Sequence, residues 1–217
     1  MASFDITSLF KNIPLSETID ICTNRLFEGV EQVRGFNKEQ FREILKLAVE
    51  DNIFIFDGKY YKQHDGVGMG SPLSCSMANL FLCHFESLWL DNCPLQYKPL
   101  LYRRYVDDTF LVFRSSHHVP LFLDYLNKQH SNIKFTSETE SNDTLAFLDI
   151  NISRVGEGFK TSFYRKPTFT GLTTKFSSFI PISYKRNLVL IVHEPGAQIQ
   201  EITTIRGHQG LMISSYF

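Results

Sequence analysis

The stretch LLYRRYVDDTFLVF, from Leu100 to Phe113, decides the predicted fold. Two runs rich in aromatic and β-branched residues flank the adjacent pair Asp107 and Asp108, and this pattern predicts a β-hairpin with the aspartates in its tight turn. Neighbouring carboxylates repel each other, and a divalent cation would relieve the repulsion because carboxylate oxygens suit Mg²⁺. The alternative is a solvated surface turn, since Asp is a common turn residue.

The N-terminal part of the chain predicts a strand and two helices. We expect residues 3–6 to end a strand that delivers Asp5 to the edge of a sheet. A first helix is expected to open near Pro14 with Ser16 as its N-cap. A second helix is expected to begin near Asn37, which forms a capping-box pattern with Gln40.

A hairpin and a glycine-dense segment follow. Asp57-Gly58 between two apolar runs is a strong hairpin signal. Residues 66–72 combine three glycines with Ser71 and Pro72, which suit the start of a helix that runs to about Asp91. Glycine permits close approach of a substrate and the helix N-terminus favours phosphate, whereas the alternative is a simple loop-to-helix junction. The expected buried stripe of that helix comprises Met77, Leu80, Phe81, His84 and Leu88.

The second half of the chain predicts one more helix and further strands. The helix is expected from Pro120 to about Gln129, and the strands at residues 133–135, 145–152 and 159–164. With the earlier elements, this order predicts an α+β fold in which helices pack on one face of an antiparallel sheet.

Composition places the chain among ordinary globular proteins. It has 217 residues, 43% of them hydrophobic and 21% charged, and a formal net charge of -1. Its four cysteines form no CxxC pair, so we expect reduced thiols in an intracellular protein of the nucleus or cytoplasm.

Charge is distributed unevenly. Between Arg154 and His193 there are seven basic residues and one acidic residue, Glu157, with aromatic rings interleaved. Basic side chains for phosphates and rings for bases are what a nucleic-acid groove requires. The alternative is a solvated face over a Phe-rich core.

Three signals are informative together: Asp5 at a strand end, Gly70-Ser71-Pro72 at a helix start, and the Asp107-Asp108 turn. Nucleotidyl transfer requires carboxylates from neighbouring strands to hold two metal ions about 4 Å apart. One acid near the start and an adjacent pair on a hairpin meet that requirement.

This ordered set resembles the palm of reverse transcriptases, and most closely that of Penelope-like retroelements. The resemblance covers residues 2 to 190, and the motifs that carry it are SFDITSLF with NIP, MGSPLS, ANL, RYVDD, FLD and YRKPT. It implies an RNA-directed DNA polymerase that uses two Mg²⁺ ions, or Mn²⁺, and that binds an RNA template, a DNA primer and dNTPs. Separately, the apolar run from Leu188 to Val192 is far too short to span a bilayer, so we expect no membrane association.

The resemblance also implies residue roles. Asp5, Asp107 and Asp108 would be the catalytic carboxylates and metal ligands, with the carbonyl of Ile6 as an additional ligand. Phe10 would be the steric gate that disfavours a 2′-hydroxyl. Gly70, Ser71 and Pro72 would form the floor of the nucleotide site. Tyr105 would lie beneath the primer terminus, and Arg165 and Lys166 would contact phosphates.

Some features depart from the family. Only four residues precede Asp5, so the sequence is expected to contain a palm at 1–166 without its fingers. Residues 167–192 would begin a thumb or connection, and 193–217 would form a tail. No GIY-YIG endonuclease and no lysine matching a general acid for pyrophosphate are found. The alternative function is a catalytically inactive retroelement remnant that at most binds nucleic acid. An unrelated two-metal nuclease or cyclase would leave Phe10 without a role.

Overall fold

The computed structural model describes residues 1–50, 52–156, 158–168 and 177–183. The chain divides after Thr139 into two compact units. The first unit contains α1 (Leu9–Asn12), α2 (Leu15–Leu26), α3 (Lys38–Val49), α4 (Pro72–Asp91), α5 (His118–Asn127), β1 (Ala2–Ile6), β2 (Ile53–Phe56), β3 (Lys59–Lys62), β4 (Leu101–Tyr105), β5 (Asp108–Val112) and β6 (Phe135–Thr139). The second contains β7 (Thr144–Phe147), β8 (Ile150–Val155) and β9 (Gly158–Phe163).

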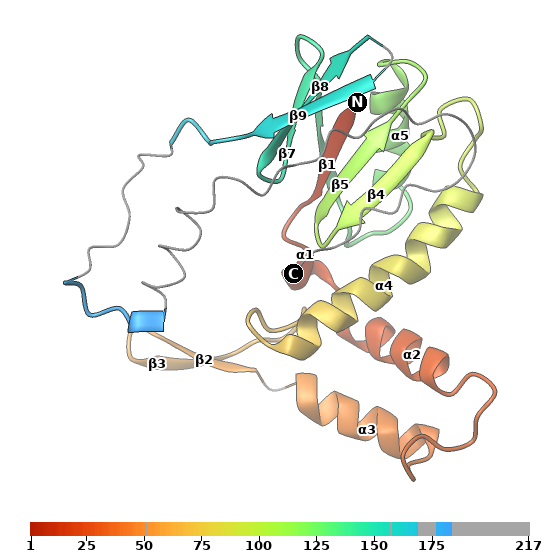
Figure 1. The fold of residues 1–217 in the computed structure, drawn as a ribbon. Coiled ribbons are helices and arrows are strands. Elements are labelled where there is room, and N and C mark those ends of the chain that lie inside the picture. The colour runs from red at the N-terminus through yellow and green to blue at the C-terminus, as the bar shows by residue number, and fades with distance from the viewer. Residues whose placement is uncertain (51, 157, 169–176, 184–217) are drawn as a thin grey trace. The chain divides into compact units, whose positions relative to one another are not determined.

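The main sheet of the first unit is antiparallel and has the strand order β4-β5-β1-β6, with β1 in the interior (Figure 1). Its strands alternate, so that Phe4 on β1 and Leu111 on β5 are buried whereas Asp5 is exposed. Helices α4 and α5 supply the opposing side chains, since the ring of Phe4 lies 5.9 Å from that of Phe122, and Trp89 lies 6.2 Å from Phe135. The α+β prediction, with helices on one face of an antiparallel sheet, is confirmed.

The predicted start of α3 is confirmed, whereas the predicted N-cap of α2 is wrong. The capping box is confirmed, because the Asn37 side chain accepts from the Gln40 amide and the Gln40 side chain accepts from the Asn37 amide. Ser16 as an N-cap was wrong: α2 begins one residue before it, and the Leu15 amide donates to Asp65 Oδ1 at 3.2 Å. The cap comes from fifty residues away, and no local pattern reveals it.

Helix α4 runs from Pro72 to Asp91 as predicted, but its buried stripe differs. His84 and Leu88 are exposed, which corrects the predicted stripe. Helix α4 packs against both α2 and strand β6 of the main sheet. Its buried face is therefore wider than a single row of side chains. The buried residues are Ser74, Met77, Ala78, Phe81, Leu82 and Trp89.

The predicted hairpin at Asp57-Gly58 is confirmed as β2 and β3, a separate two-stranded sheet. Both turn residues have positive φ, 49° at Asp57 and 70° at Gly58, as a tight type I′ connection requires. All eight strand residues are exposed, including a stacked pair of rings from Phe54 and Tyr61.

The second unit corrects one strand prediction. Residues 145–152 do not form one strand, because the chain turns at Leu148, where φ is 54°, and returns as β8. The strand predicted at 133–135 begins only at Phe135, and α5 begins two residues before Pro120. The tail predicted at 193–217 lies outside the described residues.

The cysteines are all free thiols. Cys22 and Cys93 are buried, whereas Cys75 and Cys83 are exposed. Burial raises the pKa of the Cys22 and Cys93 thiols, which therefore remain protonated and pack as small apolar groups. Of the helices in the described part of the chain, none has the length and apolar character needed to cross a bilayer.

The glycine-dense segment is docked on α1. The Val67 amide donates to the carbonyl of Phe10 at 2.8 Å. Gly66 has a φ of 78°, and a Cβ added there would lie 2.6 Å from the Phe10 oxygen and 2.7 Å from the Lys11 oxygen. Glycine at this position therefore lets the loop before α4 approach the segment that follows β1.

Replacing Gly66 by alanine is expected to destabilise the protein more than the same change at Gly29. Both glycines have positive φ, but a Cβ on Gly29 would meet nothing within 4 Å. The difference between the two losses of stability therefore measures the steric clash separately from the backbone strain. We expect Gly66→Ala to lower the free energy of unfolding by about 1–3 kcal/mol more than Gly29→Ala does. Urea denaturation measures both values, and equal losses would contradict the close packing.

Candidate active site

The register of the main sheet aligns one residue from each strand. Asp5 on β1 lies opposite Asp108 on β5 and Thr136 on β6, and Asp108 lies opposite Tyr105 on β4. Directly paired residues in an antiparallel sheet project from the same face. Because Phe4 belongs to the buried face, this row belongs to the face opposite the helices. The structure thus brings Asp5, Asp108 and Tyr105 together.

The connection between β4 and β5 is the two-residue turn Val106-Asp107, so the predicted hairpin is confirmed. The prediction that both aspartates lie in the turn is wrong for Asp108, which is the first residue of β5 and pairs with Tyr105. Val106 has a φ of 57°, which is rare for a β-branched residue and which a type II′ turn normally assigns to glycine. The amide of Ile6 donates to the carbonyl of Asp107 at 3.1 Å. This hydrogen bond ties the turn to the end of β1, one residue from Asp5.

Asp5 has a perturbed acidity. The residue is exposed overall, yet partial burial of its carboxyl is the main cause that raises its pKa above the usual value. The negative charges of Asp107 and Glu138 raise this pKa further, while the Ile6 amide opposes the shift. The negative charge of Asp107 therefore acts on the Asp5 carboxyl, an unfavourable interaction that a divalent cation between them would relieve.

A buried charge pair lies on the helix side of the same strands. Arg104 Nε and Nη2 donate to the two oxygens of Glu86 at 2.6 and 3.0 Å, and the Tyr102 hydroxyl donates to Glu86 at 2.7 Å. Burial and the Glu86 carboxylate hold the pKa of Tyr102 well above its usual value, so that its hydroxyl remains a donor.

This pair was not singled out from the sequence. Helical spacing places Asn79, Cys83 and Glu86 on one face of α4, and Arg104 Nη2 contacts the Asn79 side chain at 3.1 Å and the Cys83 sulfur at 3.5 Å. A polar stripe on an otherwise apolar helix was the available signal. Its partner on β4 could not be identified without the fold.

The carboxylates fit a hard cation. Within the described residues, no group of three or more His, Cys, Asp and Glu side chains is arranged to hold a metal ion on its own. Mg²⁺ in phosphoryl-transfer sites is typically held by one or two carboxylates together with substrate phosphates. The pair Asp5 and Asp107, whose mutual repulsion raises the Asp5 pKa, has the donor chemistry of such a site.

Other residues predicted for the site lie near the start of α4 and on α1. Gly70 has a φ of 89°, Ser71 occupies the N-cap position without a side-chain cap hydrogen bond, and Pro72 opens the helix. Phe10 lies in α1 and packs, partly buried, against the hydrophobic core. The hydrogen bond from Val67 to Phe10 links these two segments.

The predicted phosphate contacts, Arg165 and Lys166, belong to the second unit and are exposed after β9. Arg154 of the same basic segment is already paired with Glu140 at 3.0 Å, and its guanidinium lies 5.8 Å from the Phe159 ring. Three further basic residues of that segment lie outside the described residues, namely Lys175, Lys185 and Arg186.

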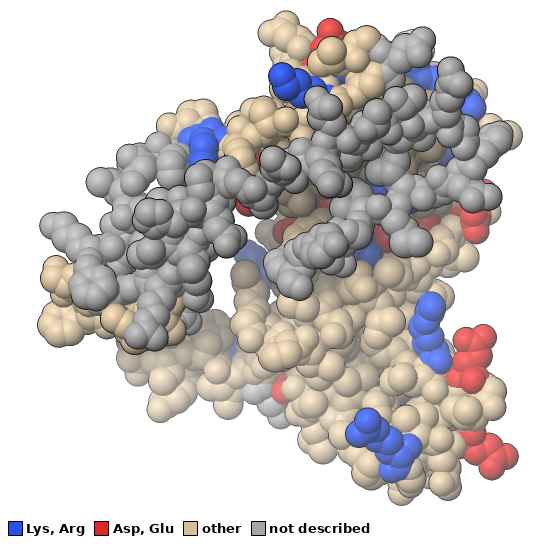
Figure 2. Space-filling view, viewed as in Figure 1, with Lys and Arg blue, Asp and Glu red and all other residues tan. Residues whose placement is uncertain are grey.

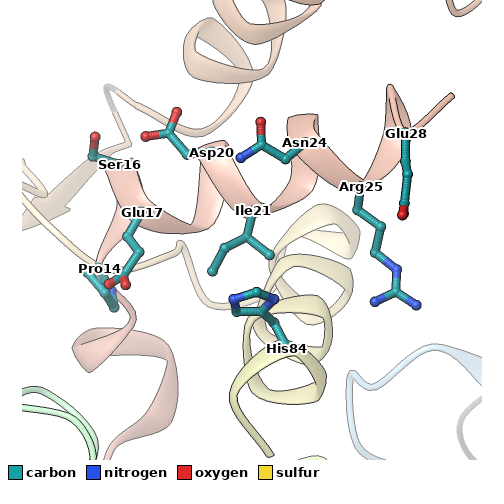
Figure 3. Close-up of a pocket in the computed structure, with 9 residues that line it drawn as sticks. All are labelled: Pro14, Ser16, Glu17, Asp20, Ile21, Asn24, Arg25, Glu28 and His84. Atoms are coloured by element: carbon teal, nitrogen blue, oxygen red, sulfur yellow. The ribbon is translucent and has the colours of Figure 1, made fainter. Parts of the chain in front are cut away.

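A pocket of about 700 Å³ lies elsewhere, along α2. Figure 3 shows Ser16, Asp20 and Asn24 on one side of the helix and Glu17 and His84 on the other, so that these polar groups do not converge. None of the predicted site residues lines it. Over α2 and α3, Figure 2 shows both acidic and basic side chains. Arg42 on α3 and Asp20 on α2 form an ion pair of 2.8 Å.

Comparison with known proteins gives one curated relative. The telomerase reverse transcriptase of Oryza sativa subsp. japonica is 29% identical over 101 residues, which cover 42% of this chain and 8% of that protein. No protein-family model matches the sequence. The chain therefore spans less than a tenth of the length of this relative.

Solved structures are similar in fold. Apo telomerase from Candida tropicalis, truncated from its C-terminal domain, matches with a TM-score of 0.52 and 19% identity over 74% of this chain and 35% of that one. Telomerase from Candida albicans, in complex with a TWJ fragment of telomeric RNA, matches with a TM-score of 0.52 and 16% identity over 73% and 31%. The chain has a reverse transcriptase-like fold, consistent with a palm.

Proposed function

We propose that this chain is the catalytic palm of an RNA-directed DNA polymerase. The observation that carries the proposal is the register that pairs Asp5 with Asp108 on the open face of the sheet, next to the Val106-Asp107 turn. Two strands there contribute the carboxylates that two-metal nucleotidyl transfer requires. The reaction would be attack of a primer 3′-hydroxyl on the α-phosphate of a dNTP, with release of pyrophosphate.

The residues on the open face of the sheet would have distinct roles in this reaction. Asp5 and Asp107 would hold two Mg²⁺ ions, with Asp108 and the carbonyl of Ile6 beside them, and Mn²⁺ would suit the same oxygens. When bound, the ions supply positive charge against the phosphate oxygens. Tyr105, half exposed at 50%, is available to support a primer terminus.

The start of α4 and Phe10 on α1 would complete the nucleotide site. Gly70, Ser71 and Pro72 would form the floor beneath the nucleotide, where the α4 N-terminus favours negative charge. Phe10 would lie under the sugar and select dNTPs. Arg165 and Lys166 would bind phosphates of the RNA template or DNA primer.

We further propose that the chain derives from a Penelope-like retroelement, with the palm at 1–166 and the start of a thumb at 167–192. The ordered motifs from Asp5 through Tyr164-Arg165-Lys166 support this origin.

Asp107→Asn is expected to abolish primer extension. Wild-type protein should extend a DNA primer on an RNA template with dNTPs and Mg²⁺. Loss of one metal-binding carboxylate should lower the rate roughly a thousandfold, equivalent to about 4 kcal/mol of transition-state stabilisation. Gel-resolved extension kinetics measure the change.

The matched control is Asp124→Asn, because Asp124 is a surface carboxylate on α5 that pairs with Lys128. This variant should extend primers as the wild type does. Equal extension by wild type and Asp107→Asn would refute the proposal. Salt-sensitive nucleic-acid binding without any extension by the wild type would instead identify a binding remnant.

Phe10→Ala is expected to weaken selection against ribonucleotides. Removing the ring would make room for a 2′-hydroxyl, and the ratio of dNTP to rNTP incorporation should fall roughly tenfold to a hundredfold. Single-nucleotide incorporation with each substrate measures that ratio. Phe41→Ala is the control, since Phe41 is also partly buried against the core but lies on α3, and an equal effect there would contradict the role of Phe10.

Asp107→Asn is also expected to lower the pKa of Asp5, because it removes a neighbouring negative charge. Mg²⁺ should lower this pKa in the wild type and less so in the variant. Carbon-detected NMR titration of the Asp5 carboxyl measures both shifts without requiring activity. A pKa unaffected by Mg²⁺ would argue against a cation at this pair.

The raised pKa of Asp5 makes the stability of the folded state depend on pH in a defined direction. Since the pKa of Asp5 is higher in the folded than in the unfolded chain, the folded state binds more protons, and the stability contribution of Asp5 falls as pH rises from the unfolded towards the folded pKa. Asp5→Asn should therefore raise the free energy of unfolding above that window and have no such effect below it. Urea denaturation on both sides of the window checks the sign.

A further inference from the structure

The guanidinium of Arg104 bridges α4 and the Val106-Asp107 turn. One edge of the guanidinium makes the bidentate contact to Glu86, and Nη1 donates to the carbonyl of Val106 at 3.0 Å. Nη2 also contacts the Asn79 side chain. A single planar group is therefore bonded to a long helix and to the first residue of the turn at the same time.

Stability alone does not account for this arrangement. The side chains of Arg104 and Glu86 are only 7% and 12% exposed. The free energy needed to remove two charges from water is about as large as the free energy gained from their attraction. Apolar residues of similar size often stabilise a protein equally well. Fixing a particular geometry is the best-attested role of such a pair.

The geometry that needs fixing is that of Val106. A β-branched residue with a φ of 57° stores backbone strain and persists only where its surroundings determine its conformation. Val106 is 41% exposed as a residue, so packing does not hold it firmly. The hydrogen bond from Arg104 to the Val106 carbonyl therefore restrains the backbone of Val106, which side-chain packing does not.

We infer that Arg104 is a positioning residue that, anchored by Glu86, holds the Val106 carbonyl and thereby sets the place of Asp107 beside Asp5. This inference deepens the proposed function and rests on it for its catalytic meaning. The turn is tied on both sides: Arg104 holds Val106 from the helix side, and the Ile6 amide holds the carbonyl of Asp107 from β1. Lysine cannot replace this fork, because it presents one compact ammonium without a planar pair of edges.

The test compares amide hydrogen exchange in wild type and Arg104→Lys. The Ile6 amide reports directly on the turn, because it donates to Asp107. The Leu82 amide, inside α4 at a fully buried residue, reports on the stability of the fold. We expect exchange at Ile6 to rise tenfold or more relative to Leu82, the order expected from loss of a hydrogen bond to a charged group.

Arg103→Lys is the matched control. Arg103 is the adjacent arginine on the same strand, is exposed, and donates to the carbonyl of Tyr102. Its replacement should leave the ratio of the two exchange rates unchanged. Equal acceleration at Ile6 and Leu82 in Arg104→Lys, or no acceleration at either amide, would overturn the inference by leaving Arg104 a purely structural role or none.

A milder variant covers the case in which Arg104→Lys does not fold. Asn79→Ala, at an exposed residue, removes the Nη2 contact together with a weaker contact of 3.7 Å from the Cys83 sulfur, and leaves the Arg104–Glu86 pair in place. It should raise the Ile6-to-Leu82 ratio about threefold. An unchanged ratio in this folded variant would then overturn the inference.

Extension kinetics separate this inference from the proposed function. Where wild type extends primers, Arg104→Lys should lower kcat at least tenfold while KM for dNTP stays within about twofold, because the misplaced carboxylate affects the chemical step. A wild-type chain that extends no primer contradicts the proposed function, whereas the exchange ratio, measured without metal or nucleic acid, still decides whether Arg104 holds the turn.

Discussion

The antiparallel pairing of β1 with β5 is the constraint on which the candidate site depends. It sets Phe4 opposite Thr109 on the buried side and Asp5 opposite Asp108 on the open side. A slip of one residue would exchange these faces, placing a carboxylate in the core and an aromatic ring in solvent. Burial of Phe4 against Phe122 therefore secures the register, and the register in turn brings the acidic residues together.

The site concentrates features that cost stability. Asp5 and Asp107 repel each other, Val106 adopts a strained conformation, and Arg104 and Glu86 are charges withdrawn from water. Two of these costs are offset within the protein: that of the buried ion pair by its bidentate hydrogen bonds, and that of the turn by hydrogen bonds from both sides. Such clustering of strain and shifted acidity is typical of functional sites.

Local patterns were enough for much of the fold. The two aromatic and β-branched runs within residues 100–113 predicted the hairpin, Asn37 and Gln40 predicted a helix start, and Asp57-Gly58 predicted a turn. The errors arose where distant residues decide the outcome. Asp65 caps α2 in place of Ser16, and residues 145–152 turn at Leu148, which carries no glycine signal. Asp5 and Asp107 were predicted as partners, but the bond between Arg104 and Glu86 requires two elements to be placed in space.

The β2–β3 hairpin has a consequence for handling the protein. Its strands expose Ile53, Phe54, Ile55 and Phe56 on one side of the turn, with Tyr60 and Tyr61 on the other. A short two-stranded ribbon rich in β-formers, with Lys59 and Lys62 as its charged strand residues, is a template for strand addition. Self-association at high concentration is therefore expected to begin at this hairpin, and charged substitutions at its exposed rings offer a route to better solubility.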